Sequence, residues 1–289
     1  MKVSILGGGF GIYGYLPAFV QLGHEVQTLS KYKSFMFARP ELKNFIEYVH
    51  FIEDEENLIL NDDLLVIARK PIQQYNSVIQ RSIPIKHIFL EKPLAPSKEL
   101  HEKLVQFLSY RNQNFSVAYL FRFTPWFKFL KQDMMEPYRN VSINWYIQRI
   151  ASDWKMDSSS GGGLLKFYAV HFLDVLYELG VSISMIKISE KTEDELTLKA
   201  TSSLGNFIEI NLIATNQSRF QIKISKMEDE LLWERQNPFL EPRIEGFLDP
   251  RVKYLKTYIE STLLMNERQT AIERENFIIK GMELLTINQ

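Results

Sequence analysis

The chain has 289 residues, of which 45% are hydrophobic and 24% charged, and its 34 lysines and arginines nearly balance its 35 acidic residues. This balance argues against a nucleic-acid binder, which needs a basic face, and the absence of cysteine excludes disulfides, thiolate nucleophiles and Cys-ligated metals. The sequence holds no apolar run of the roughly 18 to 20 residues that span a membrane. Its N-terminal apolar stretch is too short for a signal peptide, so we expect a soluble, cytoplasmic protein without a metal site.

The first half of the chain alternates short apolar segments with segments of helical spacing. Buried parallel strands are predicted at residues 2–6, 25–29, 64–68, 87–93 and 115–121. Helices are predicted between them at residues 12–22, 72–80 and 97–109. Strands that alternate with helices indicate βαβ units and a doubly wound parallel sheet. We therefore expect an α/β fold whose first part, residues 1–122, is a dinucleotide-binding Rossmann domain.

The hydrophobic pattern changes in the second half of the chain. A longer strand is predicted at 141–148, and segments with period-two alternation follow at 185–191, 195–202, 207–214 and 219–225. Two helices are predicted to close the chain, at 249–265 and 270–285. These elements predict an α+β domain with an open, mainly antiparallel sheet over residues 123–289, which would bind substrate and form oligomers. The sequence leaves open whether the C-terminal helix packs back on the first domain.

A glycine-rich loop follows the first predicted strand. The segment LGGGFGIYG fits a dinucleotide fingerprint in two frames, one beginning at Gly9 and one at Gly7. We prefer Gly7-x-Gly9-x-x-Ile12, because the first glycine should directly follow the strand. Backbone N–H groups at the start of the next helix could then hold a pyrophosphate. The alternative is a glycine turn needed only for packing.

The end of the second predicted strand bears on the choice of cofactor. NAD-binding domains usually place an acidic residue there for the ribose 2′-hydroxyl, and the segment TLSKYKS has none. Ser30 and Lys31, with Lys33 nearby, would suit a 2′-phosphate instead. The sequence therefore favours NADP over NAD, although lysines that are merely solvated in a loop explain the segment equally well.

Two further segments carry side chains suited to chemistry. LEKPLA, at residues 90–95, places Lys92 at the carboxyl end of a predicted parallel strand, where doubly wound sheets bind their ligands. Its ammonium could hold a substrate oxygen or donate a proton, and a plain surface lysine is the alternative. GGGLLKFYAVHFLD, at residues 161–174, places His171 in a helix that begins at three glycines. By itself, His171 is most simply a buried core histidine.

Together with LPAF at residues 16–19, these motifs resemble the Gfo/Idh/MocA family, the relatives of glucose–fructose oxidoreductase and inositol dehydrogenase. The resemblance covers essentially the whole chain in motif order. It implies that the glycine loop holds NAD(P) and that Lys92 lies close to the nicotinamide and the substrate. It also implies that His171 lies across from Lys92 as a proton donor or acceptor, and that the peptide before Pro93 is often cis.

Other positions follow from the same resemblance. ARKP, at residues 68–71, resembles a loop that lies against the cofactor, and Arg122 resembles a basic residue near the substrate, with a structural ion pair as the alternative. Lys92 and His171 are thus the predicted catalytic residues. The predicted cofactor-binding residues are Gly7, Gly9, Phe10, Gly11, Ile12, Ser30, Lys31, Ala68, Lys70, Pro71, Glu91, Lys92 and Pro93. The predicted substrate-binding residues are Arg122, Tyr168 and Asp174.

One position departs from the family pattern. The family usually has an acid four residues before the histidine, and this chain has Phe167 there. In an α-helix Lys166 and Tyr168 would lie about 100° to either side of that position, so neither replaces the acid unless the helix is shifted. Asp174, three residues after His171, can share its face and orient or charge it.

The function predicted from the sequence is an NAD(P)-dependent oxidoreductase. It would move a hydride between nicotinamide C4 and a carbonyl or alcohol carbon of a sugar, cyclitol or nucleotide-linked sugar, as the resemblance implies. The alternatives are an imine reductase and a non-catalytic NAD(P)-binding sensor or subunit, the latter suggested by Phe167. We expect a homodimer or homotetramer formed through the C-terminal sheet, and no nucleic-acid or membrane partner.

Overall fold

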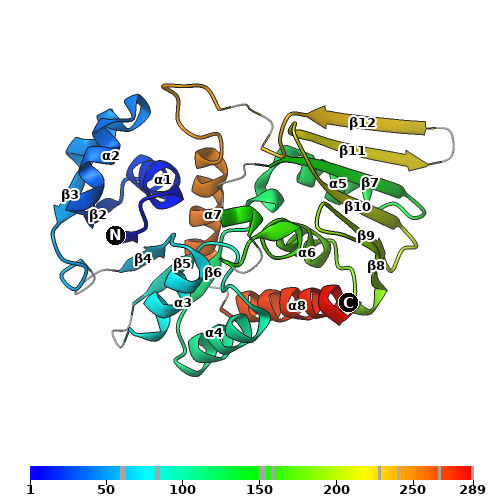
Figure 1. The fold of residues 1–289 in the computed structure, drawn as a ribbon, viewed down its shortest axis with the longest axis horizontal. Helices are drawn as coiled ribbons and strands as arrows, with labels where there is room; N and C mark the ends of the chain where they lie inside the picture. Colours follow the sequence, from blue (N-terminus) through cyan, green and yellow to red (C-terminus); the bar gives the residue numbers. More distant parts are fainter. Residues whose placement is uncertain are drawn as a thin grey trace. The chain divides into compact units, whose positions relative to one another are not determined.

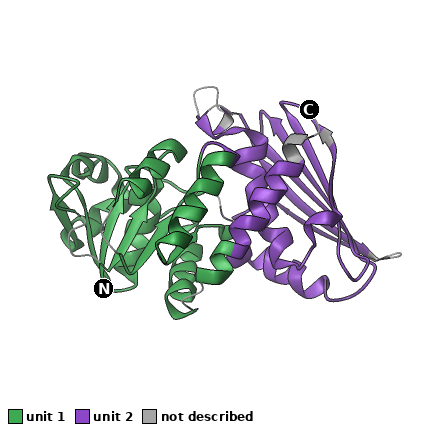
Figure 2. Cartoon of the chain, turned by 90° about the horizontal axis from the view of Figure 1, so that it is seen from below, with its two compact units in different colours: residues 1–95, 99–120, 243–272 green, residues 96–98, 121–242, 273–289 purple. Residues whose placement is uncertain are grey.

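The computed structural model describes residues 1–58, 63–81, 85–149, 154–157, 160–226, 229–239, 241, 243–265 and 268–287. The chain forms two compact units, coloured separately in Figure 2. The first consists of residues 1–95, 99–120 and 243–272, and the second of residues 96–98, 121–242 and 273–289.

The first unit is built on a six-stranded parallel sheet, which confirms the predicted Rossmann-type fold. Its strands are β1 (Lys2–Leu6), β2 (Glu25–Leu29), β3 (Val49–Ile52), β4 (Leu64–Ile67), β5 (His87–Leu90) and β6 (Phe115–Val117). They lie in the order β3-β2-β1-β4-β5-β6. The inner strands β4 and β5 are buried along their whole length, as expected for apolar runs in a parallel sheet that is covered on both faces.

Helices cover both faces of this sheet. The π-helix η1 (Gly11–Tyr15) continues into α1 (Leu16–Gln21), and α2 (Lys33–Phe37), α3 (Pro71–Ile79) and α4 (Lys98–Tyr110) follow along the chain. The strand order reverses between β1 and β4, so right-handed crossovers place α1 on one face and α3 and α4 on the other (Figure 1). The carboxyl ends of β1, β2, β4 and β5 therefore share one edge of the sheet.

Two predicted strands are shorter than expected. β5 ends at Leu90 rather than at residue 93, because Pro93 has no N–H to donate to a sheet ladder. β6 ends at Val117 rather than at residue 121, because the chain turns there: the Tyr119 N–H donates to the Val117 carbonyl at 2.9 Å. Strand β3 and helix α2 had no clear signal in the sequence.

The second unit is built on a mixed, mainly antiparallel sheet, as predicted. Its strands are β7 (Asn140–Gln148), β8 (Ile186–Lys191), β9 (Glu195–Thr201), β10 (Phe207–Thr215), β11 (Arg219–Lys226) and β12 (Asp229–Arg235), in the order β12-β11-β7-β10-β9-β8. β7 and β10 pair in parallel, and the other pairs among the described residues are antiparallel. Buried residues alternate with more exposed ones along β7, so one face of the sheet forms the core.

Helices complete the second unit. They are α5 (Pro125–Asp133), the π-helix η7 (Leu164–Ala169), α6 (Val170–Glu178) and most of α8 (Arg268–Ile287). α8 lies against α6. A Cβ at Gly281 would lie 2.7 Å from the Leu173 side chain, and the ring centroids of Tyr177 and Phe277 are 5.5 Å apart. Among the described residues, no helix is both long and apolar enough to cross a membrane.

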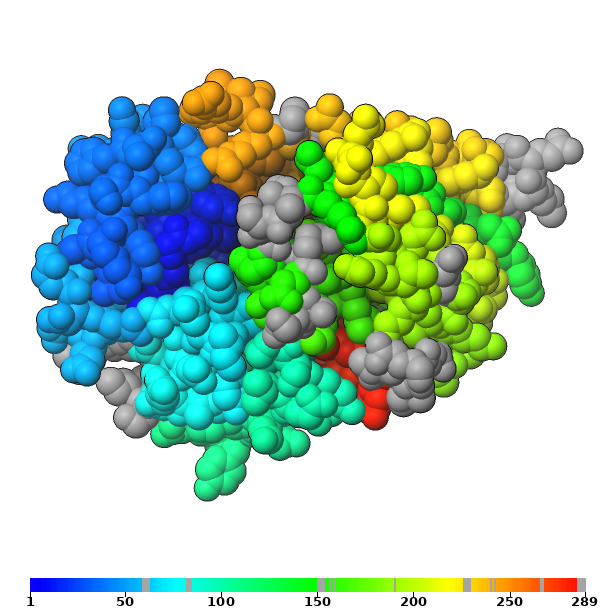
Figure 3. Space-filling view, viewed as in Figure 1, coloured from blue at the N-terminus to red at the C-terminus, as the bar shows by residue number. Residues whose placement is uncertain are grey.

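Residues 243–272 belong to the first unit, although the chain has by then passed through most of the second. Helix α7 (Val252–Met265) packs on α1, and the buried Tyr258 donates its hydroxyl to Ser116 Oγ on β6 at 2.6 Å. The Tyr258 ring also meets Phe89 of β5, with centroids 5.8 Å apart. The orange segment that leads into α7 reaches the surface beside the blue N-terminal residues in Figure 3. Because α7 packs on α1 and on strands of the parallel sheet, the first unit includes residues from late in the sequence, and no single boundary separates the two units.

Candidate functional site

The turn after β1 fits glycine alone. Gly7 directly follows the strand with φ of +135°, and a Cβ there would lie 2.1 Å from the carbonyl oxygen of Ala68. The loop after β1 and the loop after β4 are therefore in close backbone contact. This is the arrangement expected of the frame that begins at Gly7, in which the first glycine makes the tight turn.

The next glycines have different roles. At Gly9, no heavy atom of the described residues lies within 4 Å of the Cβ position, so the backbone is open there. The Gly9 carbonyl accepts the N–H groups of Ile12 at 2.9 Å and Tyr13 at 3.2 Å, which starts η1. A Cβ at Gly11 would lie 3.2 Å from Ile5 and 3.3 Å from the Ala68 side chain. Gly11 thus lets the helix approach the sheet.

Tyr32 covers the glycine turn, which the sequence did not predict. Ser30, Lys31 and Tyr32 form a 3-10 helix directly after β2, and a Cβ at Gly8 would lie 2.6 Å from the Tyr32 ring. The Lys31 ammonium lies 5.3 Å from the centroid of the same ring. Burial raises the pKa of the Tyr32 hydroxyl, which also interacts with Arg69 beyond β4. A ring among backbone turns gives little signal in the sequence, because tyrosine is common in any core.

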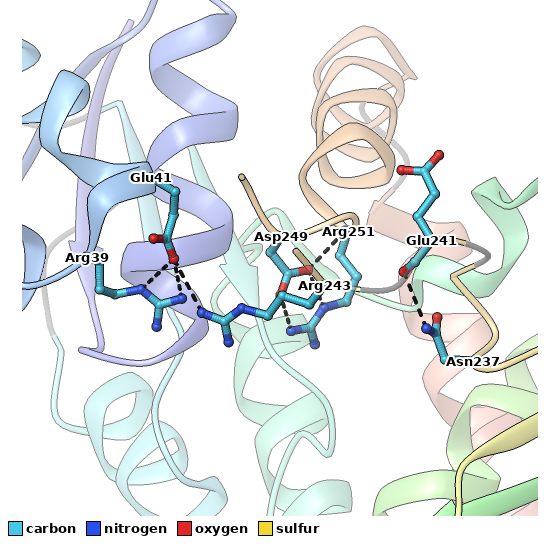
Figure 4. Close-up of polar contacts among 7 residues, drawn as sticks. All are labelled: Arg39, Glu41, Asn237, Glu241, Arg243, Asp249 and Arg251. Carbon is cyan, nitrogen blue, oxygen red and sulfur yellow. Dashed lines mark hydrogen bonds and ion pairs between the residues drawn. The ribbon is translucent and has the colours of Figure 1, made fainter. Parts of the chain in front are cut away.

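The segment that leads into α7 is fixed to the first unit by charged side chains (Figure 4). Arg251 makes a two-pronged ion pair with Asp249, with both N–O distances at 2.8 Å. Its guanidinium lies 4.1 Å from the centroid of the Phe10 ring in the glycine loop. Arg243 reaches Glu41 at 3.3 Å, and Glu41 also pairs with Arg39. The sequence could not show the Arg251–Phe10 and Arg243–Glu41 contacts, because they join residues more than 200 positions apart.

Glu91, Lys92 and Pro93 lie immediately after β5, at the edge that carries the glycine loop. The Lys92–Pro93 peptide is cis, as the family resemblance implied. Burial raises the pKa of the Glu91 carboxyl to about 7 against the opposing effects of Lys92 and Arg251. Burial, with Glu91 next to it, also raises the pKa of the Tyr15 hydroxyl well above its ordinary value. Glu91 therefore holds its proton close to neutral pH.

The remaining predicted cofactor residues lie at the same edge. Ala68 follows β4, Lys70 is the N-cap residue of α3, and Pro71 is its first residue. Proline suits that first position, because its missing N–H would have no partner within the helix. The first unit thus brings together the loops after β1, β2, β4 and β5, each of which carries part of the predicted cofactor set.

In the second unit, His171 is buried within an aromatic cluster. It is the second residue of α6 and is 4% exposed. Its ring stacks on Phe121, with centroids 4.4 Å and planes 18° apart, and Trp145 lies 6.3 Å away. Tyr168 meets Trp145 nearly at right angles at 5.2 Å, and is half-buried. The second unit thus gathers two of its predicted site residues, His171 and Tyr168, around one tryptophan.

The helix before His171 differs from the expected one. Residues 164–169 form a π-helix that begins after Gly163, whose φ is +85°. In a π-helix the hydrogen bonds join residues five apart, so the α-helical spacing assumed for Lys166, Phe167 and Tyr168 does not hold. Phe167 contacts Trp154 at 5.4 Å and Tyr168 at 5.0 Å, so it lies in an aromatic cluster. Such π-turns often occur at functional sites.

Asp174 and Arg122 take part in a network of ion pairs. Asp174 is fully buried, and its Oδ1 lies 3.0 Å from Arg274 Nε of α8. Glu178, one turn further along α6, also pairs with Arg274 and lies 3.4 Å from Arg122. Burial raises the pKa of Asp174 to about 6 despite these arginines. The Arg122 contact is the structural ion pair that the sequence left open as the alternative to substrate binding.

Among the described residues, no cluster of three or more histidine, aspartate and glutamate side chains could hold a metal ion.

Comparison of the sequence with known proteins gives one weak relative. No family model matches the chain. An uncharacterized oxidoreductase of Synechocystis sp. is 24% identical over 247 residues, and the match covers 78% of this chain. The match covers 66% of that relative, slightly less than two thirds of its length.

Two solved structures illustrate the range of the fold. The WlbA dehydrogenase from Thermus thermophilus, in complex with NAD and UDP-GlcNAcA, is 16% identical with a TM-score of 0.68, covering 98% of this chain and 93% of its own. The super-repressor mutant of Gal80p from Saccharomyces cerevisiae is 13% identical with a TM-score of 0.70, covering 100% and 97%. The chain therefore has the same fold as these two proteins, which confirms the fold that the resemblance in the sequence implied.

Proposed function

We propose that the chain is an NAD(P)-dependent oxidoreductase that acts on a sugar, a cyclitol or a nucleotide-linked sugar. The observation that carries this proposal is the open backbone at Gly9, which follows the tight Gly7 turn at the carboxyl end of β1. Side chains are absent where a pyrophosphate would have to approach, and the first turn of a helix begins there. The Synechocystis relative supports an oxidoreductase activity, and the NAD complex of WlbA supports this cofactor class.

The residues of the first unit fit a nicotinamide dinucleotide. Backbone N–H groups from Gly9 to Gly11 would hold the pyrophosphate, and the loops at Ala68–Pro71 and Glu91–Pro93 would lie along the rest of the molecule. When bound, the dinucleotide supplies the hydride donor or acceptor at nicotinamide C4. Ser30 and Lys31, with no acidic residue in the turn after β2, favour a 2′-phosphate. NADP is therefore the proposed cofactor in preference to NAD.

Proton transfer is assigned to Lys92 and His171. Lys92 follows the strand whose end faces the ligand edge of the sheet, where its ammonium can polarise a carbonyl oxygen or protonate an alkoxide. His171 is held by Phe121 in one ring orientation, which suits a proton donor or acceptor that must not rotate. Tyr168, Arg122 and Asp174 remain candidates for substrate binding, although the ion pairs of Arg122 and Asp174 also explain these two residues structurally.

The first experiment measures binding of NADPH and NADH by their fluorescence, followed by turnover with a panel of sugars, cyclitols and nucleotide sugars. We expect binding of both dinucleotides, with NADPH tighter, and turnover that Lys92→Met reduces by a factor of about 100 or more. Lys103→Met, at an exposed position on α4, is the matched control and should leave turnover unchanged. Failure of both dinucleotides to bind would overturn the proposal.

The cofactor preference has its own test. Lys31→Ala should lower the affinity for NADPH several-fold and leave NADH unaffected, because only NADPH carries the 2′-phosphate. Lys43→Ala, an exposed lysine outside the turn, is the control. An unchanged NADPH/NADH ratio in Lys31→Ala would remove the preference for NADP.

A second candidate function is a non-catalytic dinucleotide-binding protein. Two observations favour it: Phe167 stands where the family usually has an acid, and a repressor variant, that of Gal80p, shares the fold. Dinucleotide binding with no turnover across the substrate panel would support this function over the enzyme.

The proposal includes a homodimer or homotetramer formed through the second sheet. The face of that sheet opposite its buried core carries polar side chains, among them Asn144 and Asn211, which are hydrogen-bonded at 2.8 Å. Light scattering should give a mass of two or four chains. A single-chain mass would remove this part of the proposal and leave the enzymatic part intact.

A further inference from the structure

Gln74 holds the backbone on both sides of Lys92. It lies on α3 and is fully buried. Its Nε2 donates to the carbonyls of Glu91 at 2.7 Å, Leu94 at 3.1 Å and Pro93 at 3.3 Å. Its Oε1 accepts the Glu91 N–H at 2.9 Å. One carboxamide thus contacts the residue before Lys92 twice and the two residues after it once each.

These contacts replace a sheet ladder that has ended. β5 stops at Leu90, and residues 91–97 of the described chain belong to no helix or strand. Buried backbone carbonyls without a partner destabilise the folded chain, so the segment needs donors from elsewhere. Gln74 supplies them from the helix that follows the neighbouring strand, β4.

A glutamine is chemically specific for this place. Three of the facing groups are carbonyl oxygens and one is an N–H, so the side chain must both donate and accept while staying uncharged. A glutamate would set a carboxylate against carbonyl oxygens, and a leucine would leave all four groups without this partner.

We propose that Gln74 is the positioning residue for Lys92. This inference rests on the proposed function, which gives Lys92 its role near the reacting atoms. With its backbone fixed on both sides, Lys92 has only its own side-chain torsions to adjust. Displacing a catalytic group by about 1 Å can cost 100-fold in rate, so loss of the Gln74 contacts should appear in turnover.

The first test compares Gln74→Leu with Gln73→Leu, its exposed neighbour on α3. For Gln74→Leu we expect kcat to fall about 10- to 100-fold with little change in the dissociation constant of the dinucleotide. Gln73→Leu should change neither. In the double variant Gln74→Leu/Lys92→Met, turnover should be no lower than in Lys92→Met alone, because Gln74 acts through Lys92. Additive losses in the double variant would overturn the proposal.

A second variant separates positioning from a general loss of structure. In Gln74→Glu the new carboxyl faces carbonyl oxygens, which raises its pKa, and its protonated form restores one donor and one acceptor. Turnover of this variant relative to the wild type should therefore rise as the pH is lowered, and Gln74→Leu should show no such recovery. It also replaces Gln74→Leu if the leucine variant does not fold.

A third measurement is independent of turnover. The rate at which an amine-reactive acylating reagent labels Lys92, measured by mass spectrometry with Lys103 as internal reference, reports the setting of the Lys92 side chain. We expect this ratio to change at least threefold in Gln74→Leu or Gln74→Glu. An unchanged ratio overturns the proposal. If the ratio changes while the wild-type chain turns over no substrate, the positioning stands and the proposed enzymatic function fails.

Discussion

The guanidinium of Arg251 lies 4.1 Å from the centre of the Phe10 ring, and this contact joins the returning C-terminal segment to the glycine loop. Arg251 is also paired with Asp249 through two N–O contacts of 2.8 Å. The aspartate fixes the guanidinium, and the guanidinium covers the ring that begins η1. The loop proposed to hold the dinucleotide is thus completed by residues from the far end of the chain.

Arg251→Gln should therefore destabilise the first unit. The variant loses a cation–π contact and a half-buried, two-pronged ion pair, for which we expect about 1 to 3 kcal/mol of unfolding free energy. Urea denaturation measures the change. Arg219→Gln is the control, because Arg219 makes an equally close pair with Glu234 at a fully exposed position, where such pairs contribute little. Equal effects of the two substitutions would contradict the role given to Arg251.

Gly9→Ala should separate dinucleotide binding from stability. The added methyl group meets no described atom within 4 Å, so we expect the unfolding free energy to change by less than about 0.5 kcal/mol. The dissociation constant of NADPH should rise at least tenfold, because the methyl group would stand where the pyrophosphate is proposed to approach.

Substitutions at two other glycines serve as controls for Gly9→Ala. Gly7→Ala places its methyl group 2.1 Å from the Ala68 carbonyl oxygen, and we expect it not to fold. Gly23 has a φ of +76°, and no described atom lies within 4 Å of its Cβ position. Because alanine disfavours this left-handed backbone, Gly23→Ala should lower the free energy of unfolding by about 1 to 2 kcal/mol. It should leave NADPH binding unchanged. Unchanged NADPH binding in Gly9→Ala would refute the pyrophosphate site.

His87 should make the protein less stable in acid. Burial lowers the pKa of His87 from 6.5 to about 4, and its Nε2 lies 2.9 Å from Ser116 Oγ. Between pH 6.5 and 4 the unfolded chain binds a proton that the native state excludes. The His87 contribution to stability therefore falls by about 3 kcal/mol as the pH is lowered through this window. Denaturation of His87→Asn at several pH values should lack this slope, whereas His50→Asn, at an exposed position, should keep it.

Glu91 should act in the opposite direction. Its native pKa of about 7 exceeds the ordinary value of 4.5, so the native state keeps a proton that the unfolded chain loses. Its contribution to stability is fully present below pH 4.5 and falls by up to about 3 kcal/mol as the pH rises to 7. Glu91→Gln removes this loss of stability at higher pH. The free energy of unfolding of the variant should then show the opposite pH dependence that His87 causes. A Glu91→Gln curve parallel to that of Glu47→Gln, an exposed control, would contradict the raised pKa.

Arg274 should be essential for the second unit. Arg274→Met leaves the fully buried Asp174 without this partner, and removing one member of a buried ion pair costs about 3 to 5 kcal/mol. The double variant Arg274→Met/Asp174→Leu should recover part of the loss, because the unpaired Asp174 carboxylate is removed as well. Lys98→Met breaks the more exposed pair with Glu283 and should cost less than about 1 kcal/mol. A small effect of Arg274→Met would show that Asp174 is not held by it.

Much of the fold could be predicted because its signals are local. The apolar runs at β1, β2 and β4, the period-two pattern of β7 to β11 and the two closing helices lie where the sequence placed them. β3 and α2 could not be predicted, since four and five residues carry too little periodicity. The glycine loop, the EKP segment and the histidine helix were found from motif order, and the structure gives each a defined setting within its own unit.

Other features depend on contacts between distant residues. Three residues show no sign of a special role in the sequence, because their neighbours along the chain form no motif: Tyr32, Gln74 and Arg251. Their importance comes from what lies opposite: Gly8 for Tyr32, the Glu91–Leu94 backbone for Gln74, and Phe10 for Arg251. The π-helix before His171 likewise differs from the α-helix that apolar spacing predicts.

The sequence by itself determined the class of fold and the loops at which a dinucleotide is expected, because hydrophobic period, glycine position and strand ends are properties of neighbouring residues. The tertiary structure decided how those loops are held. Arg251, in the turn before α7, contacts Phe10 of the glycine loop, Gln74 hydrogen-bonds the backbone on both sides of Lys92, and Arg274 pairs with Asp174. Each of these depends on a side chain that finds its partner only after the chain has folded, since burial and hydrogen bonding are properties of the surroundings and not of the residue.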